Sequence, residues 1–260
     1  MKLRDKIILV TGGSGHIGQA IVKEIIAEGG NIILISRNIK KTKKFISELN
    51  SYQKKKCYFI KANLTSEKDL AKIKKHIFKK FKFINGVVNN AYSGKTGPLN
   101  RSRKKDFENA LNLNLYAPFK IIFDLKELLL RGESVSKETS SVVNIASMYG
   151  VVSPDQKIYR NKKNQNPVEY GSTKAGLIQM TKYLACNLNP YKIRVNSISL
   201  GPFPSQKVNL NLKKKLIQKV PMGRFGNVIE AAKPVTFLLS KESSFINGTN
   251  IKVDGGWTAW

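Results

Sequence analysis

The sequence has few of the residues that build metal centres and disulfide frameworks. Its 260 residues include two cysteines and two histidines. Cys57 and Cys186 lie far apart and form no CxxC pair, so we expect neither a disulfide framework nor a thiolate metal site. His16 and His76 are too few for a zinc site of His and Cys ligands, and neither lies in a recognisable Ser-His-Asp context. The sequence predicts no bound metal and no serine-hydrolase triad.

Long apolar runs are also missing. No segment approaches the ~20 uninterrupted apolar residues of a membrane-spanning helix. The first residues, MKLRDKIILVTGG, pass directly into a strand-and-turn pattern and lack an apolar stretch followed by a small-residue cleavage site. We therefore expect a cytoplasmic protein that neither enters a membrane nor carries a secretory leader.

Acidic residues are scarce, with 17 Asp and Glu against 46 Lys and Arg, and the formal net charge is +29. Lysines gather in NIKKTKKF, KIKKHIFKKFKF and NLKKKLIQK, where they alternate with apolar residues as on the solvated face of an amphipathic helix. Clustered lysines raise affinity for nucleic acid by counterion release. The other interpretation, which we favour, is a chain rich in Lys, Asn and Ile whose lysines fill exposed positions. An anionic small ligand would benefit from the positive field in either case.

Seven apolar stretches have the length and composition of buried strands. They are KIILVTGG, NIILISR, KCYFIKANL, INGVVNNA, SSVVNIAS, IRVNSISL and NIKVDGG. Helical periodicity lies between them, with Gly29-Gly30 ending one helix, Ser66 and Asp69 forming a predicted capping box, and one long helix over 106–130. Continuous apolar strands alternating with helices predict a three-layer, doubly wound α/β fold with a mainly parallel seven-stranded sheet. We find no repeat or linker and predict a single domain over 1–260.

A glycine-rich stretch, TGGSGHIG, directly follows the first predicted strand. Gly13, Gly15 and Gly18 fit the pattern G-x-G-x-x-G at a strand-to-helix turn. Such glycines permit close approach of the backbone to a pyrophosphate, while the helix N-terminus supplies N–H groups and positive potential. The predicted phosphate-binding residues are Gly12, Gly13, Ser14, Gly15, His16, Ile17 and Gly18. For His16, a solvent-facing position in the first helical turn is an equal alternative.

The end of the second strand predicts the cofactor. An acidic residue there would accept hydrogen bonds from the ribose 2′-hydroxyl of NAD, but this chain has Ser36-Arg37. A guanidinium suits a 2′-phosphate, and a neutral serine does not repel one. We therefore favour NADP(H), with NAD(H) as the alternative. Arg37 could also stack on adenine or face water.

The stretch YGSTK places Tyr170 and Lys174 one helical turn apart. Alone, it is most simply a surface tyrosine beside a solvated lysine. In order along the chain, however, stand TGGSGHIG, NNA at 89–91, NLY with Asn114, NIAS ending at Ser147, YGSTK and RVNSISLG. This set resembles the single-domain branch of the short-chain dehydrogenase/reductase family over nearly the whole chain. The resemblance implies a Rossmann-type fold.

The resemblance also implies catalytic roles. Tyr170 would exchange a proton with the substrate oxygen, and Lys174 would favour its phenolate and bind the nicotinamide ribose. Ser147 would stabilise charge on the substrate oxygen. Asn114 would hold a water that links Lys174 to a proton relay, with Asn112 as a rival for that role. Hydride would pass to or from the nicotinamide.

Further cofactor contacts follow from the same resemblance. Asn63 stands where the family often has an aspartate near adenine, and the segment at Asn89 and Asn90 is expected on the adenosine side, unless these are turn residues. The additional predicted cofactor-binding residues are Asn63, Leu64, Asn90, Ala91, Gly201 and Ser205, with Tyr170 and Lys174.

Departures from the family pattern concern the substrate side. His16 replaces a glycine of TGxxxGxG, and NNAY replaces NNAG, which places Tyr92 near the site. Residues 151–169 form a longer flap than usual, carrying Arg160, Lys162 and Lys163, and 202–222 form a predicted mobile substrate lid. The flap, NNAY, SMYG and DGGWTAW resemble the subset of the family associated with flagellin modification and nonulosonic sugars.

These observations predict an NADP(H)-dependent oxidoreductase acting on a carbonyl or secondary alcohol of a polar, sugar-derived small molecule. One alternative is a 3-oxoacyl-[acyl-carrier-protein] reductase, whose acidic carrier would suit the basic surface. Another is a non-catalytic protein that senses nucleotides or binds nucleic acid on the same scaffold, against which the intact catalytic residues count. The family resemblance also implies a homodimer or homotetramer.

Overall fold

The computed structural model describes residues 1–159, 161–205, 208 and 210–260. One sheet of seven strands, ordered β3-β2-β1-β4-β5-β6-β7, forms its centre, and every neighbouring pair is parallel. The strands are β1 Ile7–Thr11, β2 Asn31–Ser36, β3 Cys57–Lys61, β4 Gly86–Asn89, β5 Ser140–Ser147, β6 Ile193–Leu200 and β7 Asn250–Val253. The predicted doubly wound fold is confirmed, since the seven strands are those expected from the apolar runs.

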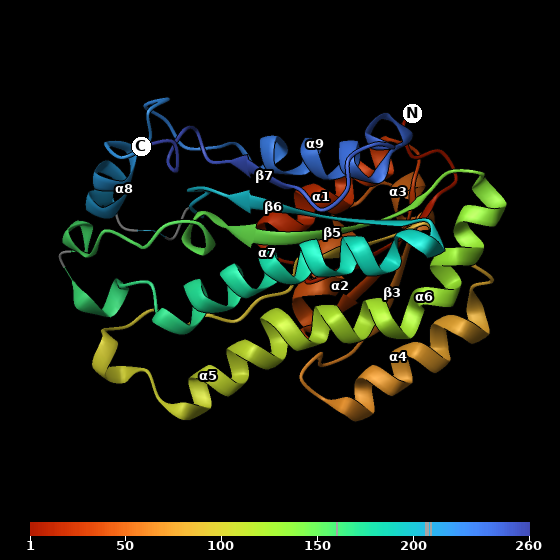
Figure 1. Ribbon diagram of the computed structural model, residues 1–260, viewed down its shortest axis with the longest axis horizontal. Helices are drawn as coiled ribbons and strands as arrows, with labels where there is room; N and C mark the ends of the chain where they lie inside the picture. The colour runs from red at the N-terminus through yellow and green to blue at the C-terminus, as the bar shows by residue number, and fades with distance from the viewer. Residues whose placement is uncertain (160, 206–207, 209) are drawn as a thin grey trace.

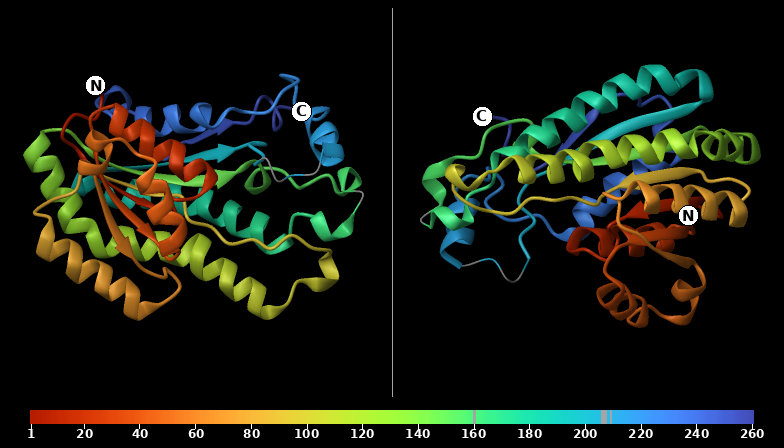
Figure 2. Two further views of the ribbon diagram at one scale, coloured as in Figure 1. Left: turned by 180° about the vertical axis from the view of Figure 1, so that it is seen from behind. Right: turned by 90° about the horizontal axis from the view of Figure 1, so that it is seen from below.

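Helices cover both faces of the sheet (Figure 1). One face is packed by α1 His16–Ala27, α2 Ile39–Ser47 and α9 Val228–Leu239. The other is packed by α4 Glu67–Lys80, α6 Ala117–Ser136 and α7 Val168–Leu188, which lie side by side in the right panel of Figure 2. Because both faces are covered, β5 and β6 are buried along their whole length.

Shorter helical segments connect these elements. They are α3 Ser51–Lys55, η1 Leu99–Arg101, α5 Lys104–Leu111, η2 Asn112–Tyr116, η3 Met148–Gly150, η4 Gln156–Ile158, η5 Lys162–Asn164, η6 Asn189–Tyr191, α8 Leu210–Ile217 and η7 Lys241–Ser243. The carboxyl ends of β5 and β6 point to the left in Figure 1, toward α8 and the flap 151–169. Arg160 of the flap, with Gln206, Lys207 and Asn209 of the expected lid, lies outside the described residues, and the assignment of flap and lid stays a prediction.

Two local predictions need correction. The long helix expected over 106–130 is interrupted by the π-helical segment η2, within which Asn114 bonds to groups outside the helix. The capping box at Ser66 is only half formed. Ser66 accepts from the Asp69 N–H, but the Asp69 carboxylate accepts from the Asn63 N–H instead of returning a bond to Ser66.

The strand order reverses between β1 and β4, which lie side by side although β2 and β3 separate them in sequence. At such a point the loops after neighbouring strands diverge and leave a crevice beyond their carboxyl ends. The glycine-rich loop follows β1, and Asn90 follows β4. The fold therefore brings the two predicted nucleotide segments together. Among the described residues, no helix is both long and apolar enough to cross a bilayer.

Candidate active site

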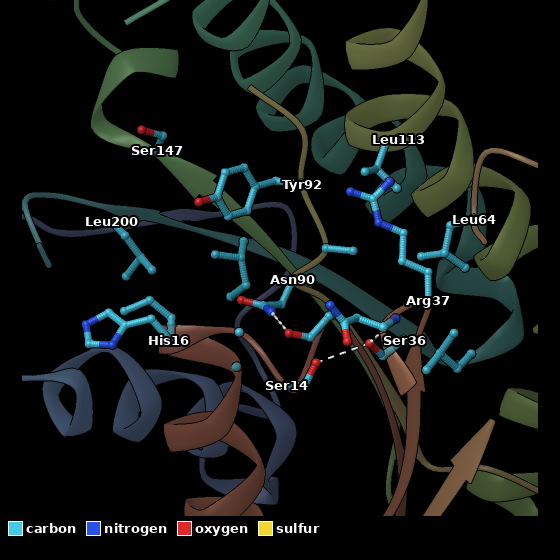
Figure 3. Close-up of a pocket in the computed structure, with 18 of the residues that line it drawn as sticks. Ser14, His16, Ser36, Arg37, Leu64, Asn90, Tyr92, Leu113, Ser147 and Leu200 are labelled. Atoms are coloured by element: carbon cyan, nitrogen blue, oxygen red, sulfur yellow. Dashed lines mark hydrogen bonds between the residues drawn. The ribbon is translucent and has the colours of Figure 1, made fainter. Parts of the chain in front are cut away.

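A cavity of about 1060 Å³ opens at this crevice (Figure 3). One end is lined by the glycine-rich loop with Arg37 and Asn63, and the other by Ser147, Tyr170 and Lys174. Of the predicted cofactor-binding residues, the cavity is lined by Gly12, Ser14, Gly15, His16, Ile17, Gly18, Ser36, Arg37, Asn63, Leu64, Asn90, Ala91, Tyr170, Lys174, Gly201 and Ser205. Two predicted site residues, Gly13 and Asn114, do not line it.

The glycine-rich loop is held against the end of β4. Gly12 has φ +64°, and a Cβ there would lie 2.8 Å from the Ala91 Cα. The Asn90 amide donates to the carbonyl oxygens of Thr11 at 3.1 Å and Gly12 at 3.0 Å. A Cβ on Gly18 would come within 2.9 Å of that same amide nitrogen. These two positions therefore require glycine, because the chain folds back onto Asn90 and leaves the first turn of α1 open to the cavity.

Gly13 is a packing position. It is buried, and a Cβ there would overlap Leu34 and lie 2.9 Å from a Val22 methyl group. Gly13 thus packs α1 onto β2 and does not line the cavity, and its predicted phosphate contact stays a prediction.

The end of β2 carries positive charge. The Ser36 hydroxyl is buried and hydrogen-bonds the Ser14 hydroxyl at 3.1 Å (Figure 3). Arg37 is exposed and extends past Leu64 in Figure 3. Lys41, four residues on in the first turn of α2, also lines the cavity. The sequence interpretation missed Lys41.

Asn63 presents one free polar group at this end. Its Oδ1 accepts from the Thr65 backbone N–H at 3.3 Å and from the Thr65 hydroxyl at 3.0 Å. Within the described part of the chain, its amide nitrogen has no hydrogen-bond partner. Asn63 is therefore arranged to donate, whereas the aspartate of the family pattern would accept.

Ser147 and Tyr170 are joined at the other end of the cavity. Ser147 ends β5 and is buried, and its oxygen accepts the Tyr149 N–H at 3.2 Å. The Ser147 hydroxyl also faces Tyr170, where a hydrogen bond from it favours the phenolate. Burial raises the pKa of Tyr170 to about 12, the Ser147 hydrogen bond opposes the rise, and Tyr92 adds to it. In this state Tyr170 keeps its proton at neutral pH.

Lys174 lies one turn after Tyr170 on α7, with its ammonium nitrogen 5.8 Å from the centre of the Tyr170 ring. The side chain is buried and donates to the Ile145 carbonyl oxygen at 2.5 Å. Burial lowers the pKa of Lys174 to about 7. A bound anion would favour the charged form, so this lysine is sensitive to what occupies the cavity.

Asn114 is fully buried beneath the site in the π-helical segment. Its Oδ1 accepts the Ser93 N–H at 2.7 Å, and its amide nitrogen donates to the Ser93 carbonyl oxygen at 2.9 Å and the Thr173 hydroxyl at 3.0 Å. Both amide protons are thus used within the protein. Asn114 links the loop after β4 to the residue before Lys174. Asn112, its rival in the sequence, is exposed.

The flap 151–169 does not line the cavity with any of its described residues. Ile158 is buried in a cluster with Met148, Tyr149 and Trp257, and Tyr159 shares a 3.1 Å hydrogen bond with the Tyr149 hydroxyl. At the outer edge Asp155 forms a 2.9 Å ion pair with Lys219. Lys162 and Lys163 are exposed. The flap therefore supports the site from behind Ser147 in this structure.

The described residues contain no group of three or more His, Cys, Asp or Glu side chains that could hold a metal ion. The cavity lining offers hydroxyls and an ammonium group. A glycine-lined loop at one end, and a serine, a tyrosine and a lysine at the other, suit proton transfer beside a bound dinucleotide.

Comparisons with known proteins agree with this geometry. Residues 13–258 match a family model described as enoyl-(acyl carrier protein) reductase. The chain is 30% identical over 259 residues to a 3-oxoacyl-[acyl-carrier-protein] reductase of Aquifex aeolicus, covering 98% of each chain. It is also 30% identical over 260 residues to the post-translational flagellin modification protein A of Campylobacter coli, covering 98% of this chain and 99% of the relative.

Solved structures show the same architecture. A short-chain dehydrogenase of Leptospira borgpetersenii with bound NAD+ superposes with a TM-score of 0.83 at 30% identity, covering 99% of this chain and 94% of the other. RhlG of Pseudomonas aeruginosa in complex with NADP superposes with a TM-score of 0.88 at 27% identity, covering 99% and 98%. The chain therefore belongs to the short-chain dehydrogenase/reductase family and is an oxidoreductase acting on CH–OH and carbonyl groups.

Proposed function

We propose that this protein transfers hydride between NADP(H) and a carbonyl or secondary alcohol of a polar, sugar-derived small molecule in the cytoplasm. The observation that carries the proposal is the convergence of Ser147, Tyr170 and Lys174 at one end of a cavity whose other end is the glycine-rich loop. The cavity thus offers a dinucleotide site and proton-transfer groups in one space.

The residues present fit a nicotinamide dinucleotide. Side chains at Gly12 and Gly18 would collide with the segment after β4, so glycine keeps the loop beside α1 open for a pyrophosphate. Gly201 and Ser205 line the opposite end, where the nicotinamide would lie, and a Cβ on Gly201 would come within 2.5 Å of the Asp254 Cα. When bound, the cofactor would supply the hydride.

The protein's own groups would then handle the proton. Tyr170, whose pKa burial raises to about 12, holds a proton that it can donate to the oxygen formed when a carbonyl is reduced. Ser147 would turn its hydroxyl from Tyr170 toward that same oxygen and stabilise the developing negative charge. Lys174, buried beside Ile145, would be drawn to its charged form by the phosphates of the cofactor. At neutral pH Tyr170 is thus in the protonated form that carbonyl reduction requires.

Preference for NADP(H) is supported at the end of β2. The position where an acidic residue would bind a ribose 2′-hydroxyl is Ser36, and both Arg37 and Lys41 line the cavity there. Two cations beside a neutral hydroxyl suit a 2′-phosphate. The solved relatives include one with NAD+ and one with NADP, so the choice rests on these side chains.

A second function has a specific observation in its favour. The Aquifex aeolicus relative is a 3-oxoacyl-[acyl-carrier-protein] reductase and is as similar to this chain as the Campylobacter coli flagellin modification protein. NADPH oxidation should therefore be followed with acetoacetyl thioesters and with polyhydroxylated ketones. Turnover of the hydroxylated ketones alone supports the proposal, and efficient turnover of the thioester favours the carrier-protein reaction. Tight, salt-dependent RNA or DNA binding without reduction of any carbonyl would favour the non-catalytic alternative.

We also propose that the protein self-associates as a homodimer or homotetramer. Phe119 and Phe123 stack at 5.9 Å on the outer side of α6, and Phe123 is 61% exposed. Apolar rings at this exposure are typical of an interface. Sedimentation equilibrium tests the proposal, and a monomer at micromolar concentration contradicts it.

A further inference from the structure

Tyr92 is a large aromatic side chain left open at the reacting end of the cavity. It directly follows Asn90 and Ala91, which are bonded to the glycine-rich loop, and its side chain is 62% exposed while lining the cavity. The hydroxyl makes no hydrogen bond to any residue within the described ranges. An exposed phenol is ordinary on a protein surface, so its fixed position is what makes Tyr92 informative.

The backbone around Tyr92 is clamped on both sides. The preceding Ala91 N–H donates to the Thr11 hydroxyl at 3.1 Å. The following Ser93 has both its N–H and its carbonyl bonded to the buried Asn114 amide, at 2.7 and 2.9 Å. Beyond it, Gly94 lies so close to Tyr170 that a Cβ would be 2.9 Å from the ring. The loop therefore cannot move Tyr92 away from the site without breaking buried hydrogen bonds.

The ring of Tyr92 contacts the reacting groups. It packs edge to face on Tyr170, with ring centres 5.9 Å apart and an angle of 70° between the planes. The Lys174 ammonium nitrogen lies 6.0 Å from its centre. Figure 3 shows the Tyr92 hydroxyl on the side of the ring that faces Ser147. Tyr92 thus presents an unpaired hydroxyl to the space where the substrate oxygen would meet Ser147 and Tyr170.

We propose that Tyr92 is a specificity-determining residue that hydrogen-bonds a hydroxyl group on the carbon next to the reacting carbonyl, so that the substrates are α-hydroxy carbonyl compounds. The inference rests on the proposed carbonyl reduction and names its substrate class. The Tyr92 and Tyr170 ring centres are 5.9 Å apart, so one small substrate can reach both side chains. An α-hydroxyl is the substrate hydroxyl that lies nearest the reacting oxygen.

The physical basis is the cost of removing water from the Tyr92 hydroxyl without replacing its hydrogen bond. Cofactor and substrate would cover the Tyr92 side chain and remove its water. A substrate with an α-hydroxyl restores that hydrogen bond, whereas a substrate without one leaves the phenol unsatisfied at a cost of roughly 1–3 kcal/mol. A polar group in a site rejects an analogue that lacks the matching group more strongly than an apolar pocket can.

Acetoin and 2-butanone test the proposal because they differ only in the hydroxyl next to the carbonyl. We expect the parent protein to reduce acetoin with a higher kcat/KM, and Tyr92→Phe to lower the ratio of the two kcat/KM values about tenfold. The matched control is Tyr183→Phe, which makes the same change on the outer side of α7, where the side chain is 65% exposed, and should keep the parent ratio. An unchanged ratio in Tyr92→Phe, or an equal loss with both ketones, overturns the proposal.

A binding measurement separates this inference from the proposed function. If the parent protein reduces neither acetoin nor 2-butanone, the proposed carbonyl reduction is contradicted for these two ketones. Titration of NADPH-loaded protein with 2,3-butanediol and 2-butanol then decides the role of Tyr92 without turnover. Tighter binding of the diol that Tyr92→Phe abolishes supports the inference, and equal binding of the two alcohols overturns it.

Discussion

The ammonium nitrogen of Lys174 lies 2.5 Å from the carbonyl oxygen of Ile145. This bond ties α7 to the end of β5, two residues before Ser147, and so fixes the register of the two elements that carry the reacting groups. Burial lowers the pKa of Lys174 to about 7, with no carboxylate contributing to the shift. The burial that holds this lysine in place therefore destabilises its charged form.

A dependence of stability on pH follows. The Lys174 pKa falls from 10.5 in the unfolded chain to about 7 in the folded protein. Between those values the unfolded state binds more protons, so the free energy of unfolding rises with pH. Between about pH 7 and pH 8.5 we expect a gain of roughly 1–2 kcal/mol relative to Lys174→Met, which retains every other titratable side chain. Urea unfolding of the cofactor-free proteins measures this, and identical slopes in both would refute it.

Tyr170→Phe should remove most of the activity and little of the fold. The phenol provides the proton, and general acid catalysis contributes roughly 10²- to 10⁴-fold. We therefore expect single-turnover hydride transfer to fall by that factor, while NADPH affinity, measured by its fluorescence, changes far less. Tyr183→Phe, on the exposed side of α7, serves as the control and should match the parent. A Tyr170→Phe rate within a few-fold of the parent would contradict this role.

Arg37→Ala should weaken NADPH binding more than NADH binding. Arg37 lines the cavity beside the neutral Ser36, and a hydrogen bond to a charged group contributes about 1.5–3 kcal/mol. We expect the Kd for NADPH to rise at least about tenfold and that for NADH to change little. The control is Lys43→Ala, which removes an exposed charge on α2, the helix that follows Arg37. Lys43 does not line the cavity. An equal rise in the Kd for both cofactors would show that Arg37 does not bind the 2′-phosphate.

Much of the fold could be predicted because the apolar composition of the strands indicates that they are buried. A strand covered on both faces is apolar throughout, as in IILVT of β1 and NIILIS of β2, and helical periodicity between strands implies a parallel order. The π-helical segment at Asn114 could not be read in this way. The Asn114 side chain within it bonds Ser93 and Thr173, which are 21 and 59 residues distant in sequence.

The candidate site shows the same division. The order of the motifs predicted that Ser147, Tyr170 and Lys174 share one site, and all three line the same cavity. The pattern G-x-G-x-x-G does not say which glycine faces the ligand, and Gly13 proves to face Leu34 and Val22 because only packing decides it. Lys41 was missed since its place in the cavity depends on the angle at which α2 leaves β2.

Gly132→Ala and Gly176→Ala should shift stability in opposite directions. A Cβ on Gly132 of α6 would overlap the carbonyl oxygen of Ile84, a backbone atom just before β4, whose neighbour Asn85 also bonds the Gly132 carbonyl. Overpacking against backbone costs about 1–3 kcal/mol. On α7, a Cβ on Gly176 would meet only Leu115 methyl groups at 3.5 and 3.6 Å, and alanine favours the helix by about 1 kcal/mol. Urea unfolding compares the two variants. No loss in Gly132→Ala would show that α6 is not packed this closely against the segment before β4, and a loss in Gly176→Ala would contradict the expected gain on α7.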